Sequence, residues 1–464
     1  MDFSFAGYGG GGKAIPTVKV STSISPSGGD DSQSIQAAID DLSKANSVDE
    51  FRGAILLQPG TFECSRPITI KTSGIVLRGS GSGPGGTVLK MTGEPHICIT
   101  ITGSDTWKEA GISTTTAADY VPAGTSMLLV ANTAGFEVGN TVRIVHPVTS
   151  AWVQFMGMDK MVRNGKAERW VSGDITTERT ITNISAQSLS LDIPLSDALD
   201  PQYLKPSAVT VKKGVAEGYI SQIGVENLRI VSPPQPVAIT DPHHSGIHLN
   251  GVTDAWVRDV GIENAVGSIQ VGSAAKRVTI EAVRMAHTEP TQGAAKPADL
   301  AADGSQILFD RCTGSGNDIF YFVTGGRVTG PNVLLHCTFH GNGHIQPHMR
   351  WATGLLVDSC EVSESGIDFM NRGEMGSGHG WTLGWGVAWN CVAKSFVIQQ
   401  PPGAMNWAIG CIGTPQKAAM PFGKEPLLPE GTYDSPGAPV APSSLYLGQL
   451  QERLGPQALK NIGY

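Results

Sequence analysis

The sequence predicts an all-β fold, a right-handed parallel β-helix, because short apolar runs recur at regular intervals through its second half. Five of the seven cysteines each close such a run, and they follow one another at intervals of 20 to 31 residues. They are Cys312, Cys337, Cys360, Cys391 and Cys411. One strand-like run per interval indicates stacked units whose apolar faces are buried only by their neighbours.

The same column extends toward the N-terminus with aliphatic residues in the cysteine's place. Val283 closes VTIEAV, Val260 closes AWVRDV and Ile230 closes VENLRI. Gly, Asn, Asp and Ser separate the runs, and no helical period appears between them. We therefore expect strands stacked about 4.8 Å apart, with the cysteines as small apolar groups on an inward ladder. The odd cysteine count and the lack of C-x-x-C argue against a disulfide framework or a zinc site.

The N-terminal part predicts a cap and the first coils. Residues 30–46 place apolar residues at helical spacing behind an Asp/Ser start, so we expect an amphipathic helix that caps the first coil. The strings GDDSQSIQAAID, ILLQPGTF and IVLRGSGSG resemble the opening of the pectate-lyase-like β-helix superfamily, which includes pectinases, uronan epimerases and phage tailspikes. The resemblance implies the fold and a carbohydrate-active protein, without naming the reaction.

The period is interrupted in the first half of the chain. SMLLVANTAGFEVGNTVRIV and RTITNISAQSLSLDIPL alternate like antiparallel strands, which predicts an inserted β subdomain. Between them lies a basic loop that is either a solvated turn or a lid over an anionic sugar chain. Its cations are Lys160, Arg163, Lys166 and Arg169. The predicted parts are 1–103 for the cap and first coils, 104–216 for the insert, 217–414 for the main coils, and 415–464 for a Pro-rich linker and a C-terminal capping helix. We expect that helix to pack on the outer surface or on the last coil.

Each coil is expected to contribute a second strand, and these strands can be aligned by their leading apolar residues. A candidate active site follows from this alignment. The inward residues chosen are Ile269, Ile319, Ile345, Phe369 and Phe396. Strand alternation then points the preceding residues outward. That row is Ser268, Asp318, His344, Asp368 and Ser395, and a parallel row is Gly272, Phe322, His348, Arg372 and Gln399. The rows predict a titratable cluster in which His344 lies between two aspartates and His348 lies beside Arg372.

Other polar and aromatic residues near these strands are candidates for substrate binding. They are Arg350, Glu374, His379, Trp381, Lys394, His340 and His248. His248 aligns with the outward row of Gln270, Phe320, Gln346 and Met370 and is a candidate for a distal sugar subsite. Trp381 is either core or a platform for a sugar ring. His336, inside an apolar run, is interpreted as a hydrogen-bonded turn residue. Polar residues in β-helix turns also bond backbone, so each single residue has a purely structural alternative.

Two reactions fit such a cluster. In β-elimination of a uronic acid, His344 or His348 is the base and Arg372 or Arg350 neutralises the carboxylate. In inverting hydrolysis, Asp318 and Asp368 are the two carboxyl groups, and two coils separate them by about 9.6 Å. We favour a polysaccharide lyase, with the hydrolase as the alternative. A carbohydrate-binding β-helix without catalysis is the third class.

Composition limits partners and cofactors. A net charge of −8 and a pI near 5.8 argue against nucleic acid, and no apolar run reaches the roughly 18 to 20 residues of a membrane span. We expect a polysaccharide or oligosaccharide substrate and a secreted or periplasmic protein, although the chain's start shows no export signal. No cofactor is required. Calcium is possible if Asp318, Asp368 and Glu374 converge without His344 between them.

Overall fold

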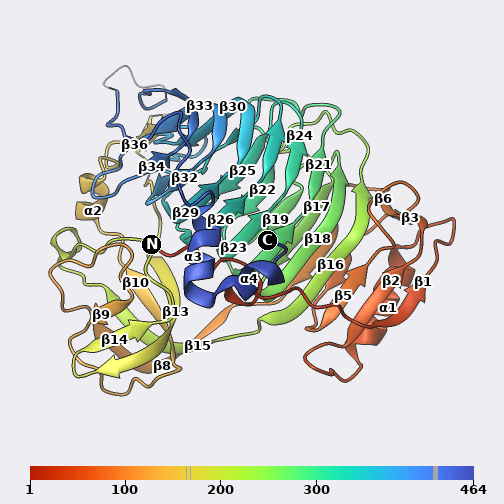
Figure 1. The fold of residues 1–464 in the computed structure, drawn as a ribbon, viewed down its shortest axis with the longest axis horizontal. Helices are drawn as coiled ribbons and strands as arrows, with labels where there is room; N and C mark the ends of the chain where they lie inside the picture. Colours follow the sequence, from red (N-terminus) through yellow and green to blue (C-terminus); the bar gives the residue numbers. More distant parts are fainter. Residues whose placement is uncertain (164, 168, 422–426) are drawn as a thin grey trace.

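The computed structural model describes residues 1–163, 165–167, 169–421 and 427–464. Their strands build a long parallel β-helix with a smaller antiparallel sheet beside it (Figure 1). A 28-stranded parallel assembly contains the coils, as the repeat predicted. Each coil contributes strands to three ladders, and each strand pairs with the equivalent strand of the next coil. The predicted fold class is confirmed.

The first ladder carries the longest strands. It comprises β1 (Val20–Ile24), β2 (Gly53–Leu57), β5 (Ile75–Arg78), the first parts of β16 (Ile220–Val231) and β18 (Val252–Glu263), β20 (Ala275–Glu281), β23 (Ser305–Asp310), β26 (Thr329–Leu335), β29 (Ala352–Asp358), β32 (Val387–Trp389), β34 (Trp407–Ile409) and β36 (Thr432–Asp434). The short β31 (Leu383–Gly384) also pairs with β29. Successive side chains along these strands point alternately into the coil and outward, and both rows are apolar where the outer face of the ladder is also covered.

The second and third ladders complete each coil. The second comprises β3 (Gly60–Cys64), β6 (Thr87–Met91), the ends of β16 and β18, β21 (Arg284–Ala286), β24 (Thr313–Ser315), β27 (Thr338–His340), the starts of β30 (Glu361–Phe369) and β33 (Val392–Ile398), and β35 (Ile412–Pro415). The third comprises β4 (Ile68–Ile70), β7 (Ile97–Thr102), β17 (Ser245–Asn250), β19 (Ile269–Val271), β22 (Ala298–Ala302), β25 (Phe320–Thr324), β28 (His344–Ile345) and the ends of β30 and β33. The third ladder positions the candidate site.

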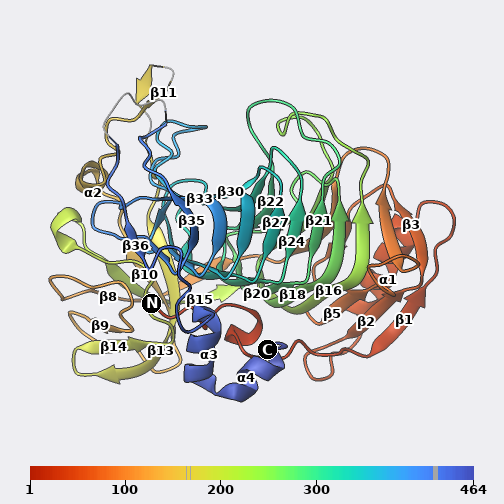
Figure 2. The same cartoon turned by 45° about the horizontal axis from the view of Figure 1, so that its top comes forward.

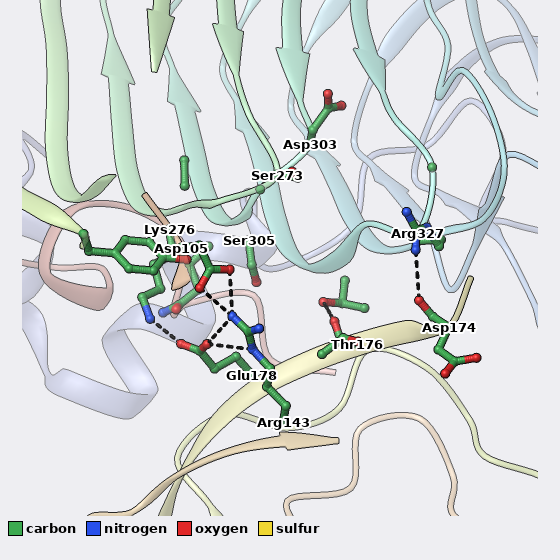
Figure 3. Close-up of a pocket in the computed structure, with 16 residues that line it drawn as sticks. Asp105, Arg143, Asp174, Thr176, Glu178, Ser273, Lys276, Asp303, Ser305 and Arg327 are labelled. Carbon is green, nitrogen blue, oxygen red and sulfur yellow. Dashed lines mark hydrogen bonds and ion pairs between the residues drawn. The ribbon is translucent and has the colours of Figure 1, made fainter. Parts of the chain in front are cut away.

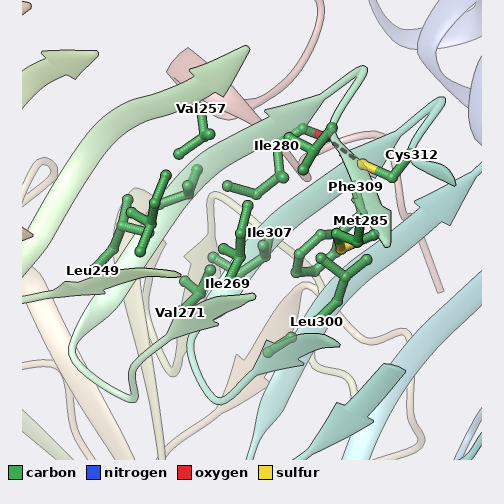
Figure 4. Packing of buried hydrophobic residues seen from close by; sticks show 14 of the residues in the cluster. Leu249, Val257, Ile269, Val271, Ile280, Met285, Leu300, Ile307, Phe309 and Cys312 are labelled. Atoms are coloured by element: carbon green, nitrogen blue, oxygen red, sulfur yellow. Dashed lines mark hydrogen bonds between the residues drawn. The ribbon is translucent and has the colours of Figure 1, made fainter. Parts of the chain in front are cut away.

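The cysteine column lies inside the coils, as predicted. All seven cysteines are buried free thiols, and Figure 4 shows Cys312 beside Ile280 and Phe309 in the apolar interior. The column continues backward through Val283 and Val260, which are fully buried. Its next member is Leu228, because Leu228 pairs with Val260 and Ile230 pairs with Ile262. The prediction of Ile230 in this column is therefore wrong by two residues.

The two ends of the chain pack differently. Helix α1 (Ser32–Ser43) buries Ile35, Ile39 and Leu42 against the first coils, as predicted for the cap. The C-terminal segment forms α3 (Leu445–Leu454) and α4 (Pro456–Asn461), which pack on the outer surface of the first ladder, one of the two expected positions (Figure 2). Their anchor is the buried carboxylate of Asp358, which accepts hydrogen bonds from the Ser444 hydroxyl and the Tyr446 N–H, each 2.7 Å long.

The segment between β7 and β16 forms its own antiparallel sheet. Its strand order is β8 (Thr106–Thr115), β15 (Thr210–Glu217), β10 (Thr141–His146), β13 (Ile175–Ser185), β14 (Ser188–Leu191) and β9 (Met127–Leu129). Helix α2 (Ser150–Phe155) and the two-stranded pair β11 (Val162–Arg163) and β12 (Lys166–Ala167) extend from it. Short 3-10 turns occur at Tyr8–Gly10 and Pro201–Tyr203. The four-part division of the chain stays a prediction.

Tryptophans join this sheet to the β-helix. Trp152 and Trp170 stack at 5.2 Å between ring centroids, and Trp351 of the β-helix meets both rings edge-on at 6.1 Å. The indole N–H groups of Trp351 and Trp385 donate to the two oxygens of Asp197 at 2.8 and 3.0 Å. Burial raises the pKa of Asp197 to about 6, and the two indole donors oppose that rise. Within the described ranges, no helix is long and apolar enough to cross a bilayer.

The buried thiols give a direct test of the coil interior. In the native protein, a water-soluble thiol reagent is expected to label none of the seven cysteines, because all are buried, and to label all of them after denaturation. Val138→Cys is the control, since Val138 is 62% exposed and a thiol there should react at once. Fast labelling of the native chain without this substitution would contradict the inward column.

Candidate active site

The outward side chains of the third ladder form a row along the β-helix. Backbone pairing aligns His248 with Gln270, Gln270 with Ala301, and Ala301 with Val323. The row continues through Gln346 to Asp368, because Phe322 pairs with Ile345 and Ile345 pairs with Ile367. The predicted alignment of His248 with Gln270 and Gln346 is confirmed. Val323 and Asp368 occupy this row where the sequence suggested Phe320 and Met370, so those two members of the predicted row are wrong.

The predicted row through Asp318 is wrong. Phe322 and Ile367 occupy the inward row of two coils where the sequence suggests Ile319 and Phe369, and the predicted rows contain no member from the coil of β22. The second predicted row is wrong at Phe322, because this side chain points into the coil interior. Asp318 lies in the turn before β25 with a φ of 59°, and its carboxylate is 3.7 Å from the Lys296 ammonium. It therefore does not flank His344.

His344 nevertheless contacts Asp368, across neighbouring coils. The His344 Nδ1–H donates to Asp368 Oδ2 at 2.7 Å, and the Gln346 amide donates to the same oxygen at 2.8 Å. Gly366 makes this contact possible, because a Cβ there would lie 3.1 Å from His344 Nδ1 and 3.2 Å from Asp368 Oδ1. The hydrogen bond to Asp368 raises the pKa of His344. The His344 side chain stays 39% exposed, whereas that of Asp368 is 6% exposed.

His348 contacts Arg372, as predicted. Arg372 Nη1 donates to His348 Nδ1 at 2.6 Å and to the His348 carbonyl at 3.1 Å. Burial and the nearby charge of Arg372 lower the pKa of His348 to about 2, so this imidazole is neutral. The ring of Phe320 lies against both, 5.2 Å from the His348 ring and 5.3 Å from the guanidinium. Phe320 also pairs with His344 along the ladder, so it borders both histidines.

The two histidines are held in opposite tautomers. A carboxylate only accepts, so the Asp368 contact fixes the proton of neutral His344 on Nδ1 and leaves a lone pair on Nε2. A guanidinium only donates, so the Arg372 contact makes His348 Nδ1 an acceptor and leaves a proton on Nε2. His344 can therefore take a proton from a ligand, and His348 can donate a hydrogen bond to one.

Arg372 is a buried cation. It is 3% exposed, burial lowers its pKa to about 10, and its Nε has no hydrogen-bond partner among the described residues. No described carboxylate lies within ion-pair distance of its guanidinium. A buried guanidinium without a contacting carboxylate favours an incoming anion, because that anion would replace the lost hydration.

The insert closes over this end of the row. The Trp170 indole donates to the His379 carbonyl at 3.0 Å, and the Val162 N–H donates to Glu374 at 3.4 Å. Burial first, and then the charges of Arg372, Arg350 and Arg163, lower the pKa of His379 to about 4. The rings of His379 and His348 lie 4.6 Å apart between centroids. The basic loop of the insert thus adds Arg163 to the site, while Asn164 and Glu168 lie outside the described residues.

The other predicted site residues have surroundings of several kinds. Trp381 is not a sugar platform, because it is 3% exposed and its indole donates to the Met156 carbonyl inside the interface with the insert. Lys394 is exposed near the start of β33, at the corner between the second and third ladders, and His340 is exposed at the end of β27. Arg350 donates to the Ser377 carbonyl at 2.6 Å, in a turn beside His379. His336, as predicted, is a satisfied turn residue bonded to the Tyr464 hydroxyl.

A groove runs along the row from His248 to His348. Its cavity has a volume of about 380 Å³. Its polar lining includes Gln270 and Lys296, and much of the rest is apolar. Sequence alignment missed Lys296, because it lies at a coil corner where no two-residue period marks the direction of its side chain.

A second cavity lies between the insert and the corners of the coils (Figure 3). Its volume is also about 380 Å³. Figure 3 shows Arg143 between Asp105 and Glu178, with Lys276 on the other side of Glu178. Asp303 lines both cavities, so the groove and this cleft meet at its side chain. Sequence alone gave no sign of this cleft, since it depends on how the insert docks.

The carboxylates proposed for calcium do not fit that ion. Asp368 pairs with His344, Asp318 with Lys296, and Glu374 accepts from the backbone of the insert. Within the described part of the chain, no group of three or more His, Cys, Asp or Glu side chains is placed to hold a metal. Calcium needs six to eight converging oxygen ligands, and the three carboxylates have separate partners.

No protein-family model matches this chain, and no curated protein matches it in sequence. Solved structures with a similar chain path include three phage tailspikes. The tailspike protein gp49 of Pseudomonas phage LKA1 is 12% identical with a TM-score of 0.44, covering 88% of this chain and 72% of that one. The Gp54 tailspike of Acinetobacter baumannii bacteriophage AP22, in complex with a capsular saccharide, is 11% identical with a TM-score of 0.34, covering 89% and 73%.

A mutant tailspike of E. coli bacteriophage HK620, in complex with a pentasaccharide, is 11% identical with a TM-score of 0.46. It covers 85% of this chain, which spans only 55% of that one. Similarities this weak assign no function to the chain. The resemblance to the pectate-lyase-like superfamily stays a prediction.

The His344–Asp368 pair has a measurable signature. Asp368→Asn removes the charge and the strongest acceptor, so the pKa of His344 should fall toward its usual value of about 6.5. The pair should stabilise the folded protein fully below about pH 6.5, and this contribution should disappear as the pH rises through the raised pKa of His344. An NMR titration of the histidine ring signals measures the shift. Asp318→Asn is the control and should leave His344 unchanged, and an equal shift in both variants would contradict the geometry.

Proposed function

We propose that this protein is a polysaccharide lyase that cleaves a uronic-acid-containing polymer by β-elimination. The observation that supports it best is that His344 and His348 are held in opposite tautomers, beside the buried cation Arg372. Environments that push the pKa values of two titratable groups apart are typical of a site in which one group acts as the base and the other as the electrophile. Both histidines border Phe320, at one end of a groove that can hold a sugar chain.

His344 is the proposed base. Its exposed Nε2 removes the proton from the carbon α to the uronate carboxyl group, while Asp368 holds the Nδ1–H and stabilises the imidazolium that forms. The electron pair of that C–H bond forms the new double bond, and the bond from the β carbon to the leaving oxygen breaks. The leaving oxygen takes a proton from solvent or from the imidazolium, so the step needs no oxidant or reductant.

His348 and Arg372 are proposed to bind the carboxylate of the same sugar. Removal of the α proton moves charge onto that carboxylate, and the His348 Nε2–H together with the guanidinium behind it stabilises the charge as it develops. Arg350 and Arg163 add positive potential from the corner and from the insert. The basic loop of the insert then acts as one wall of an anion site.

The other classes have less support. Inverting hydrolysis through Asp318 and Asp368 loses its basis, because Asp318 lies in a turn beside Lys296 and off the row of Asp368. If no polymer is cleaved, the conclusion is that the protein binds carbohydrate without catalysing a reaction. A substrate of this kind is met outside the cytoplasm, so a secreted or periplasmic location is part of the proposal.

Loss of the base should abolish elimination. His344→Ala is expected to lower turnover of an acidic polysaccharide by at least about a hundredfold, while the midpoint of thermal unfolding changes little because the side chain is half exposed. The assay follows the ultraviolet absorbance of the unsaturated uronate, which elimination creates and hydrolysis does not. Asp318→Asn is the matched control and should keep most of the activity. A His344→Ala protein within threefold of the unmodified chain would refute the assignment.

Loss of the buried cation should have a similar effect by a different route. Arg372→Ala is expected to lower kcat/KM by about a hundredfold or more, as the loss of one charge stabiliser does. Arg372→Lys keeps the charge but loses the planar pair of donors, so its activity should lie between that of the unmodified chain and that of Arg372→Ala. Arg66→Ala, at a side chain 64% exposed, controls for the removal of a positive charge. Unfolding measurements on each variant separate catalytic loss from loss of the fold, and full activity in folded Arg372→Ala would disprove the role.

A further inference from the structure

Positive charge is concentrated at one end of the groove. Arg372, Arg350 and Arg163 gather around His379 beside the insert. The carboxylates at that end are Asp368, which bonds His344 and also acts on Arg372, and Glu374, which accepts from the insert backbone. Three cations therefore stand against two carboxylates. This end therefore offers a net cationic site for one acidic sugar.

The rest of the groove carries almost no net charge. Its single lysine, Lys296, is 3.7 Å from Asp318, and the row beneath it presents Gln270, Ala301 and Val323. Burial first, and then His243, lower the pKa of His248, so its ring is neutral at neutral pH. Apolar patches and amide groups suit the faces and hydroxyl groups of neutral sugars, and they give a carboxylate no counter-charge.

The cleft beyond Asp303 is not cationic either. Two of its cations are already satisfied, since Arg143 is bonded to Asp105 at 2.6 and 2.7 Å, and Lys276 is paired with Glu178 (Figure 3). Among the lining residues, four are acidic and three are basic. They are Asp105, Asp174, Glu178, Asp303, Arg143, Lys276 and Arg327. Asp303 lies where the groove enters this cleft and would repel a second carboxylate there.

We propose that the substrate is a heteropolysaccharide in which neutral sugars flank each uronic acid, and that the groove and the interdomain cleft bind those neutral neighbours. This inference rests on the proposed function and goes further, because it excludes polymers in which every residue is a uronic acid. Such a polymer would bring one uncompensated carboxylate after another onto Gln270, Ala301 and Asp303. An alternating polymer places its carboxylate beside Arg372 and its neutral residues over the uncharged floor.

Binding tests the inference independently of cleavage. The full-length His344→Ala protein is titrated by calorimetry with two tetrasaccharides at low ionic strength. In one every residue is a uronic acid, and in the other uronic acid alternates with neutral hexose. The alternating ligand is expected to bind at least about tenfold more tightly, because each unpaired carboxylate costs desolvation without a partner. Equal binding, or tighter binding of the fully acidic ligand, would overturn the inference.

A second variant tests the charge argument itself. Asp318→Asn, made in the same His344→Ala background, releases the charge of Lys296 into the groove and should raise the relative affinity for the fully acidic ligand about threefold. Asp41→Asn, which removes an equally negative group at a side chain 78% exposed, should leave that ratio unchanged. An unchanged ratio in the Asp318→Asn protein would count against the inference.

The two proposals fail separately. If the unmodified chain releases unsaturated uronate but the fully acidic ligand binds more tightly, the substrate class is wrong and the lyase stands. If the alternating ligand binds more tightly but no polymer yields the unsaturated product, the lyase is wrong and the binding preference stands.

Discussion

The whole structure depends on one constraint, the in-register parallel pairing of each coil with the coil before it. Pairing at about 4.8 Å forces equivalent side chains into rows. Rows that point inward must be apolar along their whole length, and the five-cysteine column meets this need with a small, uncharged side chain. Rows that point outward are free to vary. The active-site candidates lie on several outward rows at one end of the third ladder, so the site is assembled from segments more than 20 residues apart, such as His344 and Asp368.

That constraint explains what sequence could predict and where it failed. The period, the N-terminal cap and the inserted sheet all follow from patterns of apolar residues, and the His348–Arg372 contact followed from a spacing of 24 residues. The row through Asp318 failed because β22, with the sequence ADLAA, has too little apolar bulk to mark a coil. Ile319 is also apolar and buried at a corner, so alternation could not choose between it and Phe322.

The contacts between the insert and the coils could not be predicted from the sequence, for a different reason. Trp381, Trp351 and Trp385 pack or hydrogen-bond against residues of the insert that are distant in the chain. The spacing of apolar residues and the helix and strand propensities carry no information about such docking, since it depends on the surfaces of two folded parts. The same docking buries His379 beside the insert and creates the cleft at Asp303. The site thus has a part dictated by coil register and a part dictated by the insert.

Register also explains how one short segment holds two histidines in opposite states. His344 and His348 lie four residues apart, but the next coil presents Asp368 to the first and Arg372 to the second. The tautomer of each imidazole is therefore set by the neighbouring coil and not by its own strand. Asp368 and Arg372, which set the two tautomers, are buried and shielded from solvent. His344, the proposed base, stays partly exposed. Insertion of one residue between Asp368 and Arg372 would therefore keep the contact of Asp368 with His344 but displace Arg372 from His348, so that only one of the two histidines would keep its partner.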